Sequence, residues 1–513
     1  MSTLEFYGGV NEVGGNKIKV NLDSTSLLLD FGMSFNQAGK YFAEFMSPRK
    51  GNGLEDYLEM GLIPDIKGIY REDYLRHKGL PFEDKPAVDG LLLSHAHADH
   101  ADYIGFLRND IPIYMSLNSR IILEVIDAIG YGSKEILTYK PEFRYYINNK
   151  GGYSERKLKK GEILPERDIR VLEPYKKETI NNLDVQLAPV DHSLPGAAAY
   201  LIEGSEERIV YTGDLRFHGR NKKDSERFVK EASKFSPNIM ICEGTRIGSG
   251  EHHEEGYFEF EEDIEKGAYE LINGFSGLII ANFPLRDLDR LITFYNIAKS
   301  TDRILLITLN QAYMLNLIKE RNAEKTIYPT LDDEHIGVYI PRKGKGAYPY
   351  DTFVSLVDDD ADDEWIPSNK EIALKDYAKW ERDYLDLPNA VNSSDIRENE
   401  CQYILRLDNF TFKELIDIKP ENAIYIHSVT EPFNDEMELS YEITENWLNH
   451  FNIPINKSFH VSGHARGAQL LDMIREINPD VLYPVHTTRI ELFDVLKDDG
   501  IEVIHPKNLN DKF

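Results

Sequence analysis

Four residues of the kinds that bind metal ions fall within six consecutive positions of this chain, directly after an apolar run. The run is residues 89–94, and the four residues are His95, His97, Asp99 and His100. An apolar run of this length predicts a buried β-strand. The rings of His95 and His97, two positions apart just past the strand, can reach one metal ion together, and Asp99 and His100 on the next turn can reach a second. The motif therefore predicts a strand, a loop and a helix that hold two metal ions.

Three further residues of these kinds stand at the ends of other predicted strands. Asp30 ends the stretch STSLLLD, His192 comes just after DVQLAPV, and Asp214 follows IVYTG. Folds of the α/β class place their chemistry at the carboxyl ends of strands. Taken singly, such a histidine is more often part of the hydrogen-bonded scaffold, and such an aspartate is often a turn residue. Their order after the histidine motif favours metal binding by His192 and Asp214, whereas Asp30 is expected to orient a ligand histidine.

The length of the chain predicts more than one domain. Its 513 residues exceed what one hydrophobic core usually spans, and 41% of them are apolar, which is enough to form real cores. Between residues 277 and 309, two apolar strands flank a segment whose leucines recur at helical spacing, and this alternation predicts a parallel α/β unit. Residues 31–88 are interpreted as an insertion, because the two strands that they separate could be joined much more briefly.

Composition indicates a cytoplasmic protein with no membrane contact. No apolar run approaches the roughly 20 residues needed to cross a bilayer, the N-terminus lacks the pattern of a secretory signal, and two cysteines cannot form a disulfide framework. The formal net charge of −29 opposes binding of a polyanion unless the basic groups gather in one groove. The clearest local basic cluster consists of Arg342, Lys343 and Lys345.

The order of these candidate ligands resembles that of a known superfamily. Asp30, then the motif from His95 to His100, then His192 and Asp214 resemble motifs one to four of the metallo-β-lactamase fold. This resemblance implies that the motif residues, His192 and Asp214 are the metal ligands of the chain.

Three later residues resemble motifs A, B and C of the β-CASP nucleases within that superfamily. They are Glu243, His464 and His486, with 221 residues from the first to the second and 22 from the second to the third. The stretches GGVNEVGGNK and HVSGHA are similar to those of ribonuclease J in particular. The resemblance covers essentially the whole chain.

The resemblance implies a fold, a domain organisation and a cofactor. The implied fold is α/β, a metallo-β-lactamase αββα sandwich formed by residues 1–248 and 456–513, with an inserted α/β β-CASP domain at residues 249–455. The implied cofactor is a pair of divalent metal ions, Zn²⁺ or Mn²⁺. By resemblance the first ion takes His95, His97 and His192, the second takes Asp99, His100 and His486, and Asp214 bridges the two.

The activity that the resemblance implies is that of a ribonuclease, which hydrolyses single-stranded RNA by means of a hydroxide activated by two zinc ions. The implied catalytic residues are Asp99, Glu243 and His464. His464 would act as the general acid, and Glu243 would orient its ring. The expected substrate contacts are Ser462, Gly463 and Arg286.

Two other functions stay open at this point. The negative charge favours a metallo-hydrolase of a small ester or phosphodiester. A DNA nuclease is opposed mainly by His486, because the DNA-repair members of the family tend to have valine at that position. The chain ends 27 residues after His486, which leaves no room for the separate C-terminal domain of ribonuclease J. The oligomeric state is therefore open, with a homo-oligomer among the options.

Overall fold

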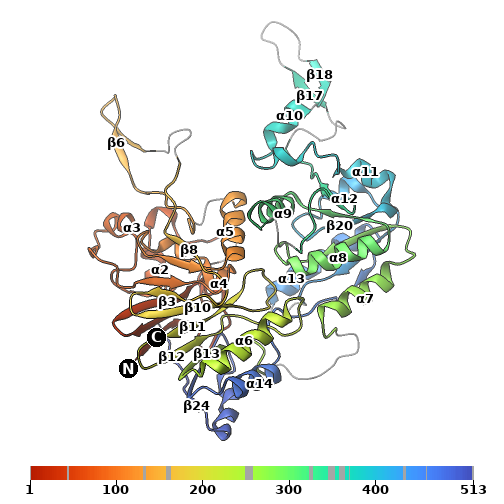
Figure 1. Cartoon of the computed structure of the whole chain (residues 1–513). Coiled ribbons are helices and arrows are strands. Elements are labelled where there is room, and N and C mark those ends of the chain that lie inside the picture. The colour runs from red at the N-terminus through yellow and green to blue at the C-terminus, as the bar shows by residue number, and fades with distance from the viewer. Residues whose placement is uncertain are drawn as a thin grey trace. The chain divides into compact units, whose positions relative to one another are not determined.

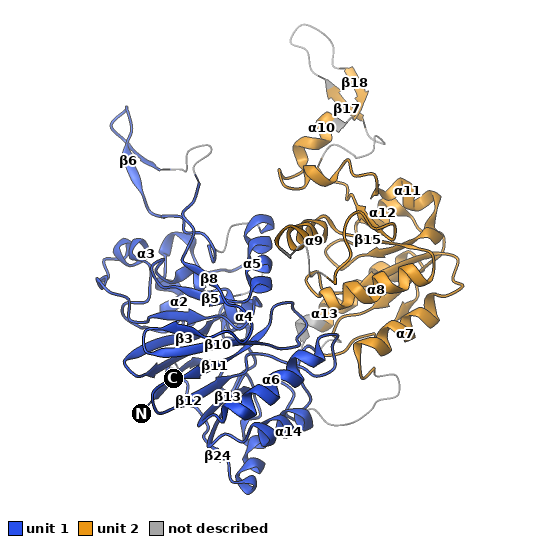
Figure 2. Ribbon diagram, viewed as in Figure 1, with its two compact units in different colours: residues 1–251, 463–513 blue, residues 252–462 orange. Residues whose placement is uncertain are grey.

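The chain divides into two compact units, which Figure 2 shows in different colours. Unit 1 comprises Met1–Glu251 and Gly463–Phe513, and unit 2 comprises His252–Ser462, so unit 2 interrupts unit 1 in the sequence. The computed structural model describes residues 2–42, 45–130, 135–156, 163–248, 258–322, 327–344, 353–356, 364–368, 370–430, 435–457 and 459–510. Among these residues, no helix has both the length and the apolar character needed to cross a membrane.

Two β-sheets form the centre of unit 1 (Figure 1). The first sheet has the strand order β1 (Thr3–Gly8), β2 (Lys17–Leu22), β3 (Thr25–Phe31), β4 (Gly90–Leu92), β5 (Ile113–Met115) and β8 (Ile169–Val171). The second has the order β24 (Glu502–Val503), β23 (Val481–Val485), β13 (Ile239–Glu243), β12 (Arg208–Tyr211), β11 (Ala198–Glu203), β10 (Leu183–Pro189) and β9 (Glu178–Ile180). In both sheets a run of antiparallel strands continues into parallel ones.

The apolar faces of the two sheets form one core. Leu27 and Leu29 of the first sheet belong to the same buried cluster as Val185 and Ile209 of the second. A second buried cluster joins the other face of the second sheet to the helices α6 (Lys222–Phe235) and α14 (Gly467–Ile477). The helices α1 (Phe35–Gly39), α2 (Glu55–Glu59), α3 (Glu72–His77), α4 (Ala98–Ala101) and α5 (Leu117–Ile129) follow the strands of the first sheet. The predicted αββα sandwich is thereby confirmed.

Unit 2 contains a parallel sheet, as the alternation of strands and helices predicted. Its strand order is β19 (Ala390–Val391), β16 (Ile336–Tyr339), β15 (Ile304–Ile307), β20 (Tyr403–Arg406), β14 (Leu278–Asn282), β21 (Ala423–His427) and β22 (Ile455–Asn456). The helices are α7 (Glu261–Ile272), α8 (Leu288–Ser300), α9 (Leu309–Asn322), α10 (Lys370–Ala373), α11 (Ser393–Glu398), α12 (Glu414–Ile418) and α13 (Asp435–His450). Inside the unit, the Arg290 guanidinium is fully buried and forms an ion pair with Glu261 at 2.6 Å.

Each unit also carries a two-stranded hairpin apart from its main sheets. In unit 1 the hairpin pairs β6 (Tyr145–Ile147) with β7 (Tyr153–Glu155). In unit 2 it pairs β17 (Phe353–Leu356) with β18 (Glu364–Pro367). Neither hairpin shares a strand with the larger sheets of the described chain.

The second domain boundary differs from the sequence-based expectation. The inserted domain was expected to end at residue 455, but β22 pairs with β21, and unit 2 continues to Ser462. The segment after β22, of which residues 459–463 are described, is irregular. The reason is that the Phe459 carbonyl accepts hydrogen bonds from Arg290 and Ser428 side chains instead of from a neighbouring strand. Lys345, of the basic cluster, lies outside the described residues.

Candidate metal centre

The candidate ligands gather because they follow the carboxyl ends of strands in the two sheets. His95 and His97 follow β4, His192 follows β10, Asp214 follows β12, and His486 follows β23. Asp99 and His100 are on α4, the single turn of helix that the motif forms. The loop of Gly32 packs directly on this turn, since a Cβ atom on Gly32 would lie 1.8 Å from the Asp99 carbonyl oxygen. Only glycine therefore allows the close approach that fixes the turn in place.

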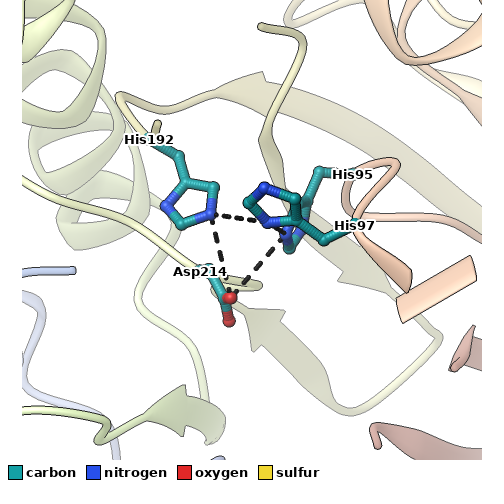
Figure 3. A group of neighbouring side chains, drawn as sticks. All are labelled: His95, His97, His192 and Asp214. Atoms are coloured by element: carbon teal, nitrogen blue, oxygen red, sulfur yellow. Dashed lines mark hydrogen bonds and ion pairs between the residues drawn. The ribbon is translucent and has the colours of Figure 1, made fainter. Parts of the chain in front are cut away.

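Three imidazole rings point their nitrogens at one another in the first cluster (Figure 3). The His97 Nδ1 atom lies 2.9 Å from His95 Nε2 and 3.1 Å from His192 Nε2. The Asp214 Oδ2 atom completes the cluster at 3.7 Å from His95 Nε2 and 4.0 Å from His192 Nε2. Four donors that converge from three segments of the chain form a shape that a cation can occupy.

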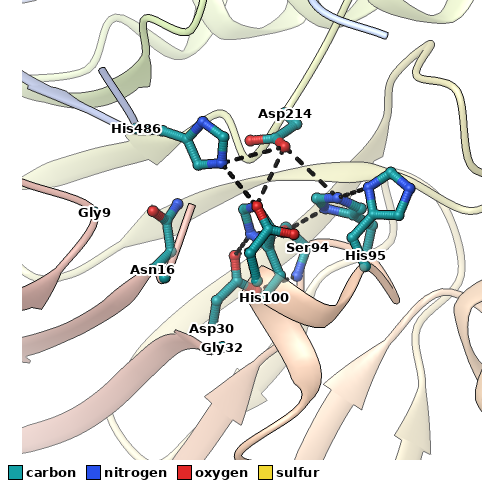
Figure 4. A network of polar contacts seen from close by, with 12 residues as sticks. Gly9, Asn16, Asp30, Gly32, Ser94, His95, His100, Asp214 and His486 are labelled. Atoms are coloured by element: carbon teal, nitrogen blue, oxygen red, sulfur yellow. Dashed lines mark hydrogen bonds and ion pairs between the residues drawn. The ribbon is translucent and has the colours of Figure 1, made fainter. Parts of the chain in front are cut away.

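The second cluster shares Asp214 with the first (Figure 4). The Asp214 Oδ2 atom lies 3.2 Å from His100 Nε2 and 3.6 Å from His486 Nε2. Asp99 Oδ2 lies 3.2 Å from His486 Nε2 and 3.7 Å from His100 Nε2. One carboxylate oxygen is thus within reach of both clusters, which is the position of a bridging ligand.

The chemistry of the donors fits divalent metal ions. Burial lowers the pKa of His95 and His192 well below the ordinary value for histidine, and it lowers the pKa of His97 to about 4. The three rings are therefore neutral, and each can present a lone pair to a metal ion. Neutral rings that face one another with their lone pairs are costly to bury unless a cation lies between them. Imidazole and carboxylate donors together suit zinc and its neighbours in the first transition row. The two clusters therefore have the donor composition of a metal site.

Partners in the surrounding structure orient the ligand rings. Asp30, fully buried at the end of β3, accepts a hydrogen bond of 2.7 Å from His100 Nδ1, which turns Nε2 toward the cluster. Asp30 also accepts from the Ser94 backbone N–H at 2.7 Å and from the Tyr211 hydroxyl at 2.6 Å. Asp30 therefore contacts His100, one of the candidate ligands, as the sequence analysis expected.

Two more orienting contacts have no signal in the sequence. The His192 Nδ1 atom donates to the Gly463 carbonyl at 2.6 Å, and His486 Nδ1 lies 2.8 Å from the Thr245 hydroxyl. Thr245 follows Glu243 by two residues, and nothing in the sequence distinguishes it from an ordinary loop residue. The role of Gly463 toward the substrate stays a prediction, and the contact that the structure shows is made by its carbonyl with His192.

A carboxylate and an imidazole form a pair beside the clusters, and together with Asp214 and His486 they make a third group of possible donors. The His464 Nδ1 atom lies 3.1 Å from one Glu243 oxygen and 3.2 Å from the other. Backbone N–H groups of Leu215 and Thr245 hold the Glu243 carboxylate in place at 2.9 and 3.2 Å. Burial alone lowers the pKa of His464, but the negative charges of Glu243 and Asp214 outweigh it and raise the pKa to about 9.

The side chains of the centre differ in how far solvent reaches them. His464 is 19% exposed and Asp99 is 17% exposed, whereas Asp214 is 2% exposed. Solvent therefore reaches the centre beside His464 and Asp99. Ser462 and Arg286, the other expected substrate contacts, belong to unit 2, and their roles stay predictions.

Family models match two parts of the chain. Residues 64–234 match the model of the Beta-lactamase superfamily domain, and residues 453–506 match that of the Zn-dependent metallo-hydrolase RNA specificity domain. The first match covers the histidine motif, His192 and Asp214, and the second covers His464 and His486. All residues of the two clusters therefore fall within matched segments.

Curated relatives and a solved structure match over most of the chain. Ribonuclease J of Pyrococcus abyssi is 23% identical over 95% of this chain and 90% of its own length. Ribonuclease J of Mycoplasma pneumoniae is 21% identical over 94% of this chain and 67% of its own length. A crystal structure of a protein of unknown function from Enterococcus faecalis V583 has a TM-score of 0.68 and 22% identity, and the alignment covers 99% of this chain and 98% of that one. This last similarity concerns the fold alone.

Proposed function

The chain belongs to the metallo-β-lactamase superfamily and is ribonuclease J-like, and on this basis we propose that it is a metal-dependent ribonuclease acting on phosphodiester bonds of single-stranded RNA. The observation that carries the proposal is the Glu243–His464 pair beside two donor clusters that share Asp214. A hydrolase of this kind needs a polarised phosphate, an activated water and a proton for the leaving group. The two clusters would hold ions that polarise the phosphate and activate the water, and the Glu243–His464 pair would supply the proton.

Two divalent ions, with Zn²⁺ first and Mn²⁺ as the other candidate, fit the donors. The residues that would hold them are His95, His97 and His192 for one ion, Asp99, His100 and His486 for the other, and Asp214 for both. When bound, such ions polarise phosphate oxygens and lower the pKa of water. The shared carboxylate of Asp214 and the orienting contacts on His100, His192 and His486 keep the donors in place without rearrangement.

Side chains of the pair would protonate the leaving group. Since Glu243 accepts from Nδ1 of His464, the Nε2–H of that ring points away from the carboxylate and can donate a proton to the departing ribose oxygen. Glu243 acts through His464 and is a positioning residue, because it holds the ring by two oxygens that the backbone also fixes. Asp99, the most exposed metal ligand apart from His97, lies on the solvent side, where substrate enters.

Thr245 offers a test of the orienting contacts. A Thr245→Val variant keeps the shape of the side chain but removes the hydroxyl next to His486 Nδ1. Loss of such an outer partner lowers metal affinity by roughly 10–100-fold. We expect this loss in a competition titration with a chelator, while Thr245→Ser retains the affinity. Equal affinity of the valine variant would mean that His486 is oriented by other contacts.

One observation favours a different substrate. The net charge of −29 suits a small ester or phosphodiester better than a long polyanion. Against this reading stand Glu243 and His464, a pair that a hydrolase of simple esters does not need. DNA is the other polyanion that such a centre could cleave.

The experiment that decides among these substrates uses matched polymers. Purified protein, loaded with Zn²⁺ or Mn²⁺, is incubated with 5′-labelled single-stranded RNA and with DNA of the same sequence. We expect RNA to be cleaved and DNA to be left intact, and the product ladder reports whether cleavage begins at an end. Cleavage of neither polymer by fully loaded protein would contradict the proposal and direct attention to small esters and phosphodiesters.

A further inference from the structure

The hairpin formed by β6 and β7 exposes aromatic side chains in an unusual way. It projects from unit 1 in Figure 1, and its register pairs Tyr145 with Glu155 and Ile147 with Tyr153. The side chains of Tyr145 and Tyr153 are 62% and 79% exposed, and Ile147 is 67% exposed. Apolar groups of this size rarely stay in contact with water without a binding role when they gather on one element.

The two faces of the hairpin carry different groups. Because side chains alternate along a strand, Tyr145, Ile147 and Tyr153 share one face with Glu155, which lies opposite Tyr145. Arg144 and Tyr146 share the other face with Arg156, which lies opposite Arg144 and donates its backbone N–H to the Arg144 carbonyl at 2.7 Å. Like charges directly opposite one another on paired strands repel. An anion beside the two arginines would relieve this repulsion.

The hairpin region is also basic in a chain that is acidic overall. Of the described residues, 140–156 contain four lysines and arginines and two acidic residues. Arg144, Lys150 and Arg156 are exposed, and none forms an ion pair with another described residue. The basic cluster singled out from the sequence differs in this respect, because Arg342 pairs with Asp417 and Lys343 pairs with Glu381.

These features together fit one kind of occupant. An acidic protein surface would satisfy the charges but would leave the rings without a matching partner. Single-stranded nucleic acid satisfies both, because its phosphates attract arginines and its unpaired bases stack on aromatic rings whatever their sequence. Tyr145 and Tyr153 are diagonal neighbours about 7–8 Å apart, so each ring can receive a separate base.

We propose that the β6–β7 hairpin is a binding site for single-stranded RNA that passes around the edge of the hairpin, with bases stacked on Tyr145 and Tyr153 on one face and phosphates held by Arg144 and Arg156 on the other. This inference rests on the proposed function, since it names where a long substrate is held beyond the metal centre. It also gives a chain with a charge of −29 one local element with which to attract a polyanion.

The test measures binding and is independent of cleavage. Two double variants are compared in full-length His464→Ala protein, namely Tyr145→Ser with Tyr153→Ser, and Arg144→Gln with Arg156→Gln. Fluorescence anisotropy with a long unstructured RNA is recorded over a series of salt concentrations. The tyrosine variant is expected to bind about tenfold more weakly or worse, as loss of base stacking requires. The arginine variant is expected to lower the slope of log affinity against log salt by about 1.4, at roughly 0.7 per phosphate contact.

Matched controls come from the same chain. Phe353→Ser with Trp365→Ser removes exposed aromatic groups, 61% and 69% exposed, from the other hairpin. Arg170→Gln with Arg475→Gln removes the same charge from arginines that are already paired with Asp168 and Asp499. Both controls are expected to bind RNA like the parent protein.

The outcomes separate this inference from the proposed function. If the wild-type protein cleaves RNA and the hairpin variants bind it as tightly as the parent, the hairpin proposal is overturned and the ribonuclease proposal stands. If RNA binds through the hairpin but is never cleaved, the hairpin proposal stands and the ribonuclease proposal fails. If the variants lose only self-association, the hairpin is a contact between copies and the proposal is again overturned.

Discussion

Replacement of His464 by alanine is expected to slow RNA cleavage by roughly 10²- to 10⁴-fold, the usual contribution of a general acid. The ring is 19% exposed, and its Nδ1 is held by Glu243, so the variant loses a proton donor beside the metal ligands without losing a ligand. Metal content is therefore expected to stay unchanged. The measurement is single-turnover cleavage of labelled RNA, with the metal content of the same sample determined by elemental analysis.

A substrate that needs no proton distinguishes a catalytic from a structural role of His464. A phosphodiester with a p-nitrophenolate leaving group departs without protonation, so the His464→Ala variant is expected to hydrolyse it at nearly the parent rate. Glu243→Gln, which disturbs the position of the ring, should show the same selective loss in weaker form. His505→Ala, which removes a histidine paired with Asp494 at 2.9 Å, serves as the control. Equal loss on both substrates would indicate that His464 supports the fold of the centre instead.

Replacement of Asp214 by alanine is expected to remove the metal ions and with them the activity. Its Oδ2 atom lies within 4.0 Å of ring nitrogens in both clusters, including His95 at 3.7 Å and His100 at 3.2 Å. The loss of affinity should exceed the roughly 10–100-fold that removal of an outer partner causes. The check is the number of equivalents of metal that survive dialysis against a weak chelator.

The control for this variant is an aspartate without a role in the centre. Asp168 is exposed and paired with Arg170 at 2.8 Å, so Asp168→Ala is expected to retain metal and activity. Retention of two equivalents of metal by the Asp214→Ala protein would be incompatible with a bridging carboxylate. Retention of one equivalent would show that one cluster holds its ion without Asp214.

The clustering of the candidate metal ligands could be predicted because it depends on local signals. An apolar run followed by His95, His97, Asp99 and His100 predicts a strand that ends at a site, and β4 ends at Leu92, three residues before His95. Strand-end placement likewise predicted that His192 and Asp214 would join the motif. Parallel strands bring their carboxyl ends to one edge, so proximity in space follows from the pattern alone.

Other parts of the fold and site depend on contacts that are distant in sequence. Thr245 can be recognised as a hydrogen-bonding partner of His486 only once it is known that β13 and β23 lie side by side. The strand β11 was missed because it is buried on both faces and its stretch AAYLIE shows no alternation. Strand β1 likewise depends on a tertiary contact, because it is stabilised by its pairing with β2.

The order of strands in the second sheet also bears on how the chain is made. Strand β13 pairs with β23, yet residues 244–480 lie between them in the sequence. At roughly 5–20 residues per second, a ribosome needs on the order of tens of seconds to synthesise that stretch. One edge of β13 therefore remains unpaired on the nascent chain while all of unit 2 is synthesised. An unpaired strand edge of this kind is a template for pairing with other chains. The ring of His486, which follows β23, joins the candidate centre only after unit 2 has been synthesised.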